Sequence, residues 1–445
     1  MTPAAHPTRP FVSFSPFTDT RSTAVVGAPP LAVLICIRFF MSISIRSLAV
    51  STTPFYLVFA SAAVFANPND SLQLSVNSSI TQDDNLFRLS GSADPKTAIG
   101  RDSAAETIRA TTVAAEFTKD YGLQHLDLRV GVVEYEYQNF KYLGFTALNY
   151  SGDLGWKFTP RLHGTMRVDR KESLAGFGDF RNFNQRNQRT ETNERFNALY
   201  ELDGAWQITG SVGRNRVQNE ATLVEQRSFT VISADAGVKR VFRSGASVGG
   251  RVRQGSGDYT QVSYAAASLL PSSFEETETE AFLAWPVSQK SRVDARVSYL
   301  RRKTAPYSVR NYDGIRANGS FLWGPTARTS LTTTVSRDIG DYQSAYSNYV
   351  RIDRLSIAPA VVLREKLVLK ISHELSRRDF GGAVPGASAG AKRSDRMQSS
   401  RLTVEWQPRE SLAFSAWVQR DRRDSNFSGL DYRSQSVGVL AQISF

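Results

Sequence analysis

The stretch YRSQSVGVLAQISF, residues 432–445, ends the chain and holds the pattern from which the fold can be inferred. Its apolar side chains alternate with small or polar ones, and they stand at Val437, Val439, Ala441, Ile443 and Phe445. Alternation with a period of two predicts a β-strand with one apolar face and one mostly polar face. Such a strand needs partners on its edges, so the upstream sequence should supply further strands of the same kind.

The same alternation recurs upstream. Rows of this kind begin near residues 126, 148, 198, 293, 367, 402 and 412. The first row, Leu72, Leu74 and Val76, can pair with the last stretch and leave no open edge. After residue 66 there is no uninterrupted run of 18 apolar residues, which excludes a membrane protein built from several spanning helices. Strands of a membrane barrel need only about 10 residues each, and half of these face water.

Short turn signals rich in Gly, Pro and Ser separate many of these rows. They are predicted at 120–122, 159–161, 208–210, 243–245, 286–290, 324–328, 363–366 and 407–411. Longer polar connections lie between them, for example at 81–104, 170–190, 255–275, 378–398 and 421–430. This arrangement predicts an all-β fold, a transmembrane antiparallel up-and-down β-barrel of about 18 strands. Sixteen strands is the alternative, because 211–227 and 338–350 are poorly patterned.

The N-terminal part of the sequence predicts export. Residues 41–66 combine Arg46, a mostly apolar stretch and small residues at Val64 and Ala66, as in a signal peptide. Residues 1–40 fit no such pattern, and we expect them to be a disordered upstream extension. The barrel is then residues 67–445. The single cysteine, Cys36, precedes it, so we expect no disulfide framework and no cysteine metal site.

Five tryptophans are predicted on the apolar faces of their strands and close to a short turn. They are Trp156, Trp206, Trp285, Trp323 and Trp406. Membrane barrels place aromatic rings at the interface, where an indole has an apolar body and a hydrated N–H. The alternative is a soluble repeat protein such as a propeller. No Asp follows any of these tryptophans, and a propeller does not account for the C-terminal Phe.

The opposite parity predicts the residues that line the lumen. Selected pore-lining residues are Arg167, Arg251, Arg253, Arg292, Arg296, Arg316, Glu278 and Glu280. Acidic and basic residues nearly cancel, so the wall is polar and charged rather than uniformly positive. The arginines on neighbouring strands form either a basic stripe for an anionic solute or ion pairs with the acidic residues between them; the sequence leaves both open.

We expect no enzyme, cofactor or metal. His125, His163 and His373 are far apart in sequence, and no motif of a hydrolase, metalloprotease or nucleotide-binding protein occurs. Excess positive charge is predicted in loops, for example at Arg301–Lys303 and Arg420–Arg423. Lipopolysaccharide phosphates or an acidic polymer would suit these loops. Nucleic acid is not expected as a partner of an exported chain.

A family resemblance rests on the segment DDNLFRL, formed by Asp83, Asp84, Asn85, Leu86, Phe87, Arg88 and Leu89. This segment, the barrel size and the terminal Phe together resemble the EpsL family, outer-membrane proteins associated with exosortase and extracellular-polysaccharide loci. The C-terminal strand also resembles the insertion signal read by the barrel-assembly machinery of Gram-negative outer membranes. The resemblance implies export of an extracellular polysaccharide, with periplasmic export components as partners. A general diffusion porin and a loop-mediated surface receptor or adhesin are the alternatives.

Overall fold

The structure, a computed structural model, describes residues 71–179, 183–221, 227–260, 271–306, 308–342, 347–382 and 392–445. The predicted signal peptide at 41–66 and the extension at 1–40 lie outside these residues. Among the described residues, no helix is both long and apolar enough to cross a membrane.

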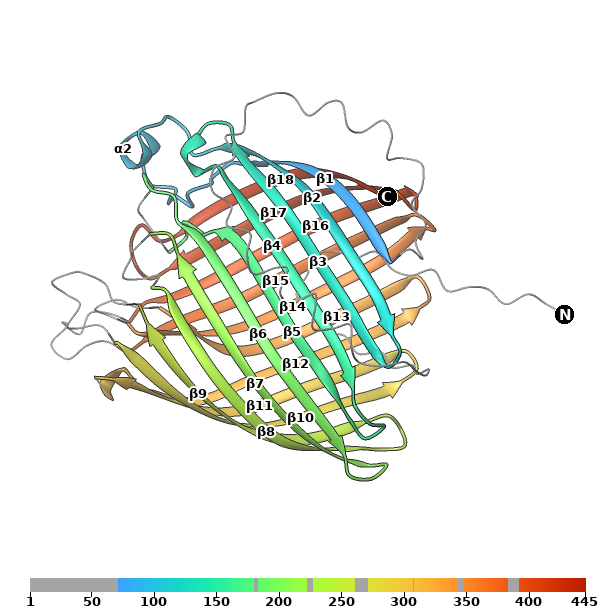
Figure 1. The fold of residues 1–445 in the computed structure, drawn as a ribbon. Helices are drawn as coiled ribbons and strands as arrows, with labels where there is room; N and C mark the ends of the chain where they lie inside the picture. Colours follow the sequence, from blue (N-terminus) through green and yellow to red (C-terminus); the bar gives the residue numbers. More distant parts are fainter. Residues whose placement is uncertain are drawn as a thin grey trace, which may run out of the picture.

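Within the described residues, eighteen antiparallel strands form one closed sheet (Figure 1). The strands are β1 (Leu72–Asp83), β2 (Glu106–Tyr121), β3 (Gln124–Tyr137), β4 (Phe145–Lys157), β5 (Leu162–Leu174), β6 (Gln188–Glu201), β7 (Trp206–Asn219), β8 (Phe229–Val241), β9 (Ser247–Tyr259), β10 (Ser273–Ser288), β11 (Ser291–Ala305), β12 (Tyr312–Thr326), β13 (Thr329–Asp341), β14 (Tyr349–Arg364), β15 (Leu367–Gly381), β16 (Ser394–Arg409), β17 (Leu412–Ser425) and β18 (Tyr432–Ser444). Short helices α2 (Pro95–Ile99), η1 (Lys141–Leu143) and η3 (Ser308–Arg310) lie in connections.

Each strand pairs with its neighbours in sequence, and β1 pairs with β18 to close the sheet. At this seam the main chains of Leu74 and Phe445 exchange both hydrogen bonds, at 3.1 and 2.7 Å. The prediction of an up-and-down barrel with 18 strands is therefore confirmed, and the alternative of 16 strands is wrong. In the part of the chain that the structure describes, closure leaves no strand edge unpaired, as a sheet surrounded by lipid requires.

The connections sort by length onto the two ends of the barrel. Short turns join β2 to β3, β4 to β5 and each later pair in the same way, and the longer connections lie at the other end. The turn predicted at 208–210 is wrong, because those residues continue β7. The chain turns at 202–205 instead, where the Asp203 carboxylate accepts hydrogen bonds from the N–H groups of Ala205 and Trp206 at 2.8 and 2.7 Å. Sequence alone favoured the Gly at 210 over this aspartate turn.

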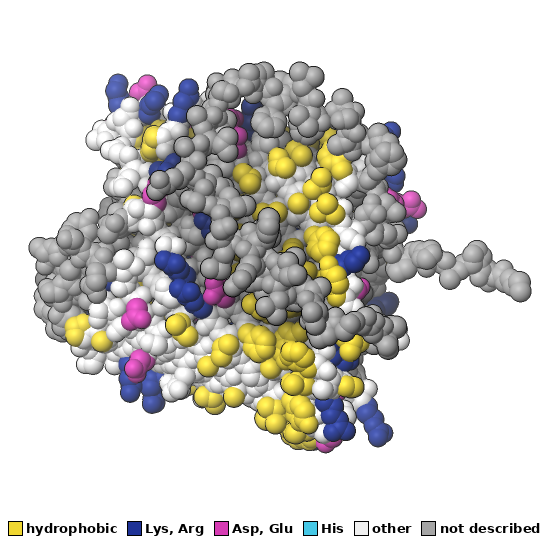
Figure 2. Space-filling model, in the orientation of Figure 1, with side chains coloured by type: hydrophobic (Ala, Val, Ile, Leu, Met, Phe, Trp, Pro, Cys, Tyr) yellow, Lys and Arg dark blue, Asp and Glu magenta, His cyan; other side chains and the backbone are white. Residues whose placement is uncertain are grey.

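The outer wall of the barrel is apolar and exposed. Val113, Ile232 and Val335 expose 59%, 63% and 55% of their surface, although all three lie in mid-strand. Figure 2 shows apolar side chains gathered on one face, with Lys and Arg toward its edges. An apolar surface this extensive is not left facing water in soluble proteins. The predicted charged loops at 301–303 and 420–423 were misplaced, because β11 and β17 extend through them.

Candidate functional site

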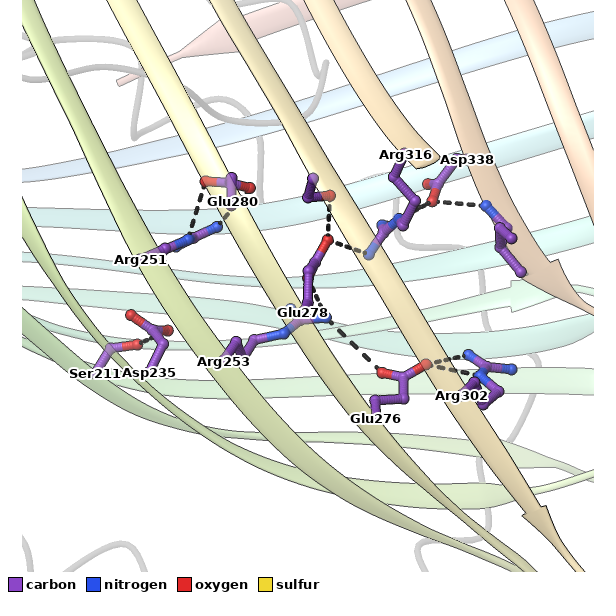
Figure 3. A network of polar contacts seen from close by, with 12 residues as sticks. Ser211, Asp235, Arg251, Arg253, Glu276, Glu278, Glu280, Arg302, Arg316 and Asp338 are labelled. Carbon is purple, nitrogen blue, oxygen red and sulfur yellow. Dashed lines mark hydrogen bonds and ion pairs between the residues drawn. The ribbon is translucent and has the colours of Figure 1, made fainter. Parts of the chain in front are cut away.

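The inner wall carries the polar side chains, because their positions alternate with those of the exposed apolar residues. Its most regular part is a row of acids on β10, formed by Glu276, Glu278 and Glu280, with side chains no more than 10% exposed. Arginines on β9 and on β11 and β12 lie on either side of this row (Figure 3). We call this set, Arg251, Arg253, Glu276, Glu278, Glu280, Arg302, Arg316 and Asp338, the charge ladder.

Glu278 lies at the centre of the charge ladder. Its carboxylate is 3.0 Å from Nη2 of Arg253 and 3.2 Å from Nη1 of Arg316, and it accepts a 2.6 Å hydrogen bond from Ser298. Arg316 also contacts Asp338, at 2.7 Å. Partners on three strands hold this buried carboxylate in place. Each lost hydrogen bond would cost about 1–3 kcal/mol, and an unpaired buried charge would cost several kcal/mol.

The outer pairs of the charge ladder complete the same pattern. Arg251 Nε lies 2.9 Å from Glu280, and Arg302 Nη2 lies 2.6 Å from Glu276. The ladder holds four arginines and four acids, so its formal charges cancel. An arginine and an acid on adjacent strands produce a field directed around the wall rather than a uniform positive potential.

Similar pairs continue around the lumen. They include Arg195–Asp235 at 2.8 Å, Arg129–Glu116 at 2.6 Å, Arg354–Glu374 at 2.9 Å and Lys370–Glu405 at 2.8 Å. Beside the ladder the wall has a hollow of about 340 Å³, lined in part by Asn193, Arg195, Asn215, Arg253, Glu276 and Arg302. Such a hollow offers amide and guanidinium donors and carboxylate acceptors, the groups that bind hydroxyls and carboxylates of small hydrophilic solutes.

The sequence-predicted lumen residues lie as follows. Arg251, Arg253, Arg316, Glu278 and Glu280 belong to the charge ladder, so ion pairing rather than an open basic stripe describes them. Arg167 pairs with Asp153, and Arg292 lies 2.7 Å from Asp294. Arg296 lies on the same face of β11 as Arg292, and among the described residues it forms no ion pair.

The DDNLFRL segment lies at the end of the barrel with the long connections. Asp83 ends β1 and accepts a bond from Arg88 at 2.9 Å, and Asn85 forms a turn by accepting a 2.8 Å bond from the N–H of Leu89. Phe87 is fully buried, with its ring 4.7 Å from that of Phe140. The segment therefore anchors the connection 84–105 to its neighbours. Asp84 faces β18, accepting the N–H of Gln435, and among the described residues no group of potential metal ligands occurs.

A second contact at this end spans the lumen. Asp179, in the connection between β5 and β6, meets three arginines from the opposite wall. Its carboxylate lies 2.6 Å from Arg393, 2.8 Å from Arg423 and 3.1 Å from Arg378. Phe177, two residues earlier, packs on Phe87 at 4.6 Å. We call the Asp179 contact with these arginines the Asp179 latch. It narrows the mouth of the barrel at this end.

Sequence reasoning missed the Asp179 latch. Nothing local marks Asp179 as different from other loop aspartates, and its partners are roughly 200 residues or more away in sequence. The five predicted interface tryptophans all lie near the short-turn end on the outer wall; Trp206, Trp285, Trp323 and Trp406 are 42–50% exposed. Trp156 is instead 9% exposed, because it stacks on Phe196 at 5.3 Å. The predicted insertion residues of β18 point outward, Val437 and Val439 being 49% and 54% exposed.

One protein family matches part of the chain. The family described as "Putative beta-barrel porin 2" matches residues 283–445, from β10 to the end of the chain. The chain is thus similar to β-barrel porins over this part. A comparison with curated proteins finds no match. The resemblance to the EpsL family stays a prediction.

Several solved structures of proteins from Pseudomonas aeruginosa are similar to this chain. OpdK with vanillate is 9% identical with a TM-score of 0.46, over 84% of this chain and 99% of OpdK. OccK2 (OpdF) in complex with glucuronate is 12% identical with a TM-score of 0.46, over 84% of this chain and 98% of OccK2. The siderophore receptor PirA is 8% identical with a TM-score of 0.41, over 85% and 81% of the two chains.

Proposed function

We propose that this protein is a porin through which small hydrophilic solutes diffuse across the outer membrane of a Gram-negative bacterium. The observation that carries the proposal is the division of one closed sheet into an exposed apolar outer wall and an inner wall of paired charges. Lipid covers the outer wall, and water fills the lumen that the inner wall surrounds. The match of residues 283–445 to a porin family supports the same conclusion. The short turns then face the periplasm and the long connections face outward.

The charge balance of the lumen indicates which solutes pass. A polar solute exchanges bonds to water for bonds to guanidinium and carboxylate groups, each already held by a partner. Because the formal charges of the ladder cancel, we expect weak selection between anions and cations. Neutral or zwitterionic solutes such as small sugars and amino acids fit this wall best.

Export of a polysaccharide, the main expectation from the sequence, is the less favoured reading. No contact within the described residues favours a polymer, and the Asp179 latch together with the packed connection 84–105 narrows the outer mouth. The porin alternative needs only that water and small solutes pass beside these connections. A receptor or adhesin role would rest on the connections alone, and no observation favours it.

The test is conductance of the purified, refolded barrel in planar bilayers, with liposome swelling in sugars of increasing size. We expect channels as soon as the protein inserts, and swelling rates that fall steeply from a monosaccharide to a hexasaccharide. The same protein heated to unfold it is the control and should give neither. A barrel that conducts only after its outer connections are deleted, and that acidic oligosaccharide then blocks, would contradict the porin and support the exporter.

A further inference from the structure

The outer wall carries charged residues where β13 to β16 approach the long connections. Arg337, Arg351, Arg377 and Arg396 lie at positions that share the outward parity of Val335 and Leu375, which expose 55% and 44% of their surface. Arg337 and Arg396 are likewise exposed. We call these four arginines, with Asp353 and Asp379 between them, the outer arginine cluster.

Two aspartates hold the cluster in order. Arg337 Nη2 donates to Asp353 at 3.0 Å, and Arg351 Nη2 donates to Asp379 at 2.6 Å. Arg377 Nε reaches the other oxygen of Asp379 at 3.1 Å. Four positive charges face two negative ones, so the cluster keeps a formal excess of +2. The guanidinium groups of Arg337, Arg351 and Arg377 are held by these aspartates and still reach solvent, since the Arg377 side chain is 57% exposed.

An apolar row lies directly beneath the cluster, toward the middle of the barrel. Val335, Leu355 and Leu375 are side by side on β13, β14 and β15, and each precedes or follows a charged residue of the cluster by two positions. Two residues of a strand span about 7 Å. The apolar row and Arg337, Arg377 and Arg396 line one shallow hollow of the outer wall. Apolar groups below and fixed cations above therefore form one surface.

From this geometry we infer that the outer arginine cluster binds the phosphorylated headgroup of lipid A, with an acyl chain lying over the apolar row. The inference rests on the membrane location in the proposed function, which places this end in the outer leaflet. Charges on a lipid-facing strand are tolerated only near the interface. Arginine forks bind phosphate oxygens in pairs, so a bound phosphate would offset the excess positive charge. A neutral or zwitterionic lipid would not.

The test uses full-length barrel purified in detergent, freed of bound lipid and titrated with diphosphoryl lipid A. Complexes are counted by native mass spectrometry. The double variant Arg337→Gln and Arg377→Gln removes two of the four cations. We expect its affinity for diphosphoryl lipid A to fall at least tenfold. Arg354→Gln is the matched control, because Arg354 lies on β14 beside Asp353, faces the lumen and pairs with Glu374 at 2.9 Å. Its lipid affinity should be unchanged.

Three results would overturn the inference. They are equal binding by the wild type and the double variant, equal wild-type affinity for phosphatidylglycerol and lipid A, or a change in the number of protein copies per complex in the double variant without any loss of lipid. Single-channel conductance of the same variants separates this question from the porin proposal. A variant that loses lipid A but conducts normally supports the site, and a barrel that binds lipid A but never conducts contradicts only the porin.

Discussion

Glu278 is the residue on which the inner wall depends most, because one carboxylate links strands β9, β10, β11 and β12. Two arginines and a serine hydroxyl point at it within 3.2 Å. Removing its charge while keeping its shape leaves Arg253 and Arg316 with one fewer partner. The wall then carries an unbalanced positive charge at its most ordered point.

Glu278→Gln should make the pore more selective for anions. Loss of one negative unit charge acting over about 8 Å through water lowers the energy of a passing anion by about 0.5 kcal/mol and raises that of a passing cation by about the same amount. Together the two changes correspond to roughly a fivefold change in the permeability ratio. The reversal potential in a KCl gradient measures this ratio. Glu275→Gln is the control. Glu275 lies three residues before Glu278 on β10, on the opposite face of the strand, and its side chain is exposed on the outer wall. Equal shifts in both variants would contradict the assignment of Glu278 to the lumen.

At this scale the sequence predicts direction but not partners. Alternation alone placed Arg251, Arg253, Arg316 and Glu278 on the polar side of their strands, where the structure also has them. Which arginine meets which acid depends on the stagger between strands. That stagger is set by turn lengths and by the closure of the whole barrel, so no local pattern contains it.

The connection from β5 to β6 is the element that shapes the mouth. Its Asp179 reaches the opposite wall in the Asp179 latch, while Phe177 and Phe183 pack against Phe87 of the connection 84–105. Packing and ion pairing thus act on the same element from its two sides. A change at Asp179 should weaken the contact of this connection with the far wall and leave the packing of Phe177 and Phe183 intact.

Asp179→Asn should raise the single-channel conductance or increase its fluctuation. A neutral amide removes the charge that Arg378, Arg393 and Arg423 share, although Arg393 keeps Asp395 at 2.6 Å and Arg423 keeps the Gly178 carbonyl. The connection is therefore held less firmly against the far wall and moves more in the lumen. Planar-bilayer recording measures both quantities. Asp102→Asn is the control, because Asp102 lies at the same end with its side chain 91% exposed. Conductance that is identical in wild type and Asp179→Asn would show that the latch does not narrow the pore.

The Asp179 latch should open only in strong acid. Burial works against ionisation of Asp179, but the charges of Arg393, Arg423 and Arg378 outweigh it and lower its pKa below the ordinary aspartate value. Because the folded-state pKa is the lower one, the latch has its full stability above about pH 3.9 and loses it as the pH falls through the folded value. Conductance should be flat from pH 5 to 8 and rise in stronger acid. Asp179→Asn should show no such rise.

Element by element, the sequence predicted strands well and their connections only in part. Period-two alternation identifies a strand because one face meets lipid and the other water along its whole length. The turn at Asp203 was missed, since an aspartate turn competes there with a nearby glycine. The role of DDNLFRL as an anchor follows from its short polar side chains and its Phe, but the partner rings Phe140 and Phe177 come from other connections.

The whole molecule is defined by the seam between β1 and β18. Leu74 and Phe445 exchange both main-chain bonds, so the alternation of an antiparallel pair makes Asn77 and Gln442 a non-hydrogen-bonded pair. Such pairs bring Cα atoms to about 4.5 Å, within the range that a disulfide requires. Both residues have lumen-facing parity, so a link between them would disturb no lipid contact.

Asn77→Cys with Gln442→Cys, in a chain with Cys36→Ser, should form a disulfide on mild oxidation of the folded barrel. Asn77→Cys with Gln435→Cys is the control. Gln435 lies on the same strand seven residues away, about 23 Å by strand geometry. Mobility on a non-reducing gel reports the link. Cross-linking of both pairs to the same extent would contradict the register of the seam.

That seam has a consequence for how the protein is made. The seam joins β1 and β18, the first and the last strands of the barrel to be synthesised. An incomplete chain therefore cannot close the barrel. Until β18 is present, the free edges of the outermost strands expose unpaired N–H and C=O groups, and the cell must keep these edges from aggregating. Biogenesis should therefore be all-or-none, with a chain cut short at its end degraded rather than stored as a smaller ring.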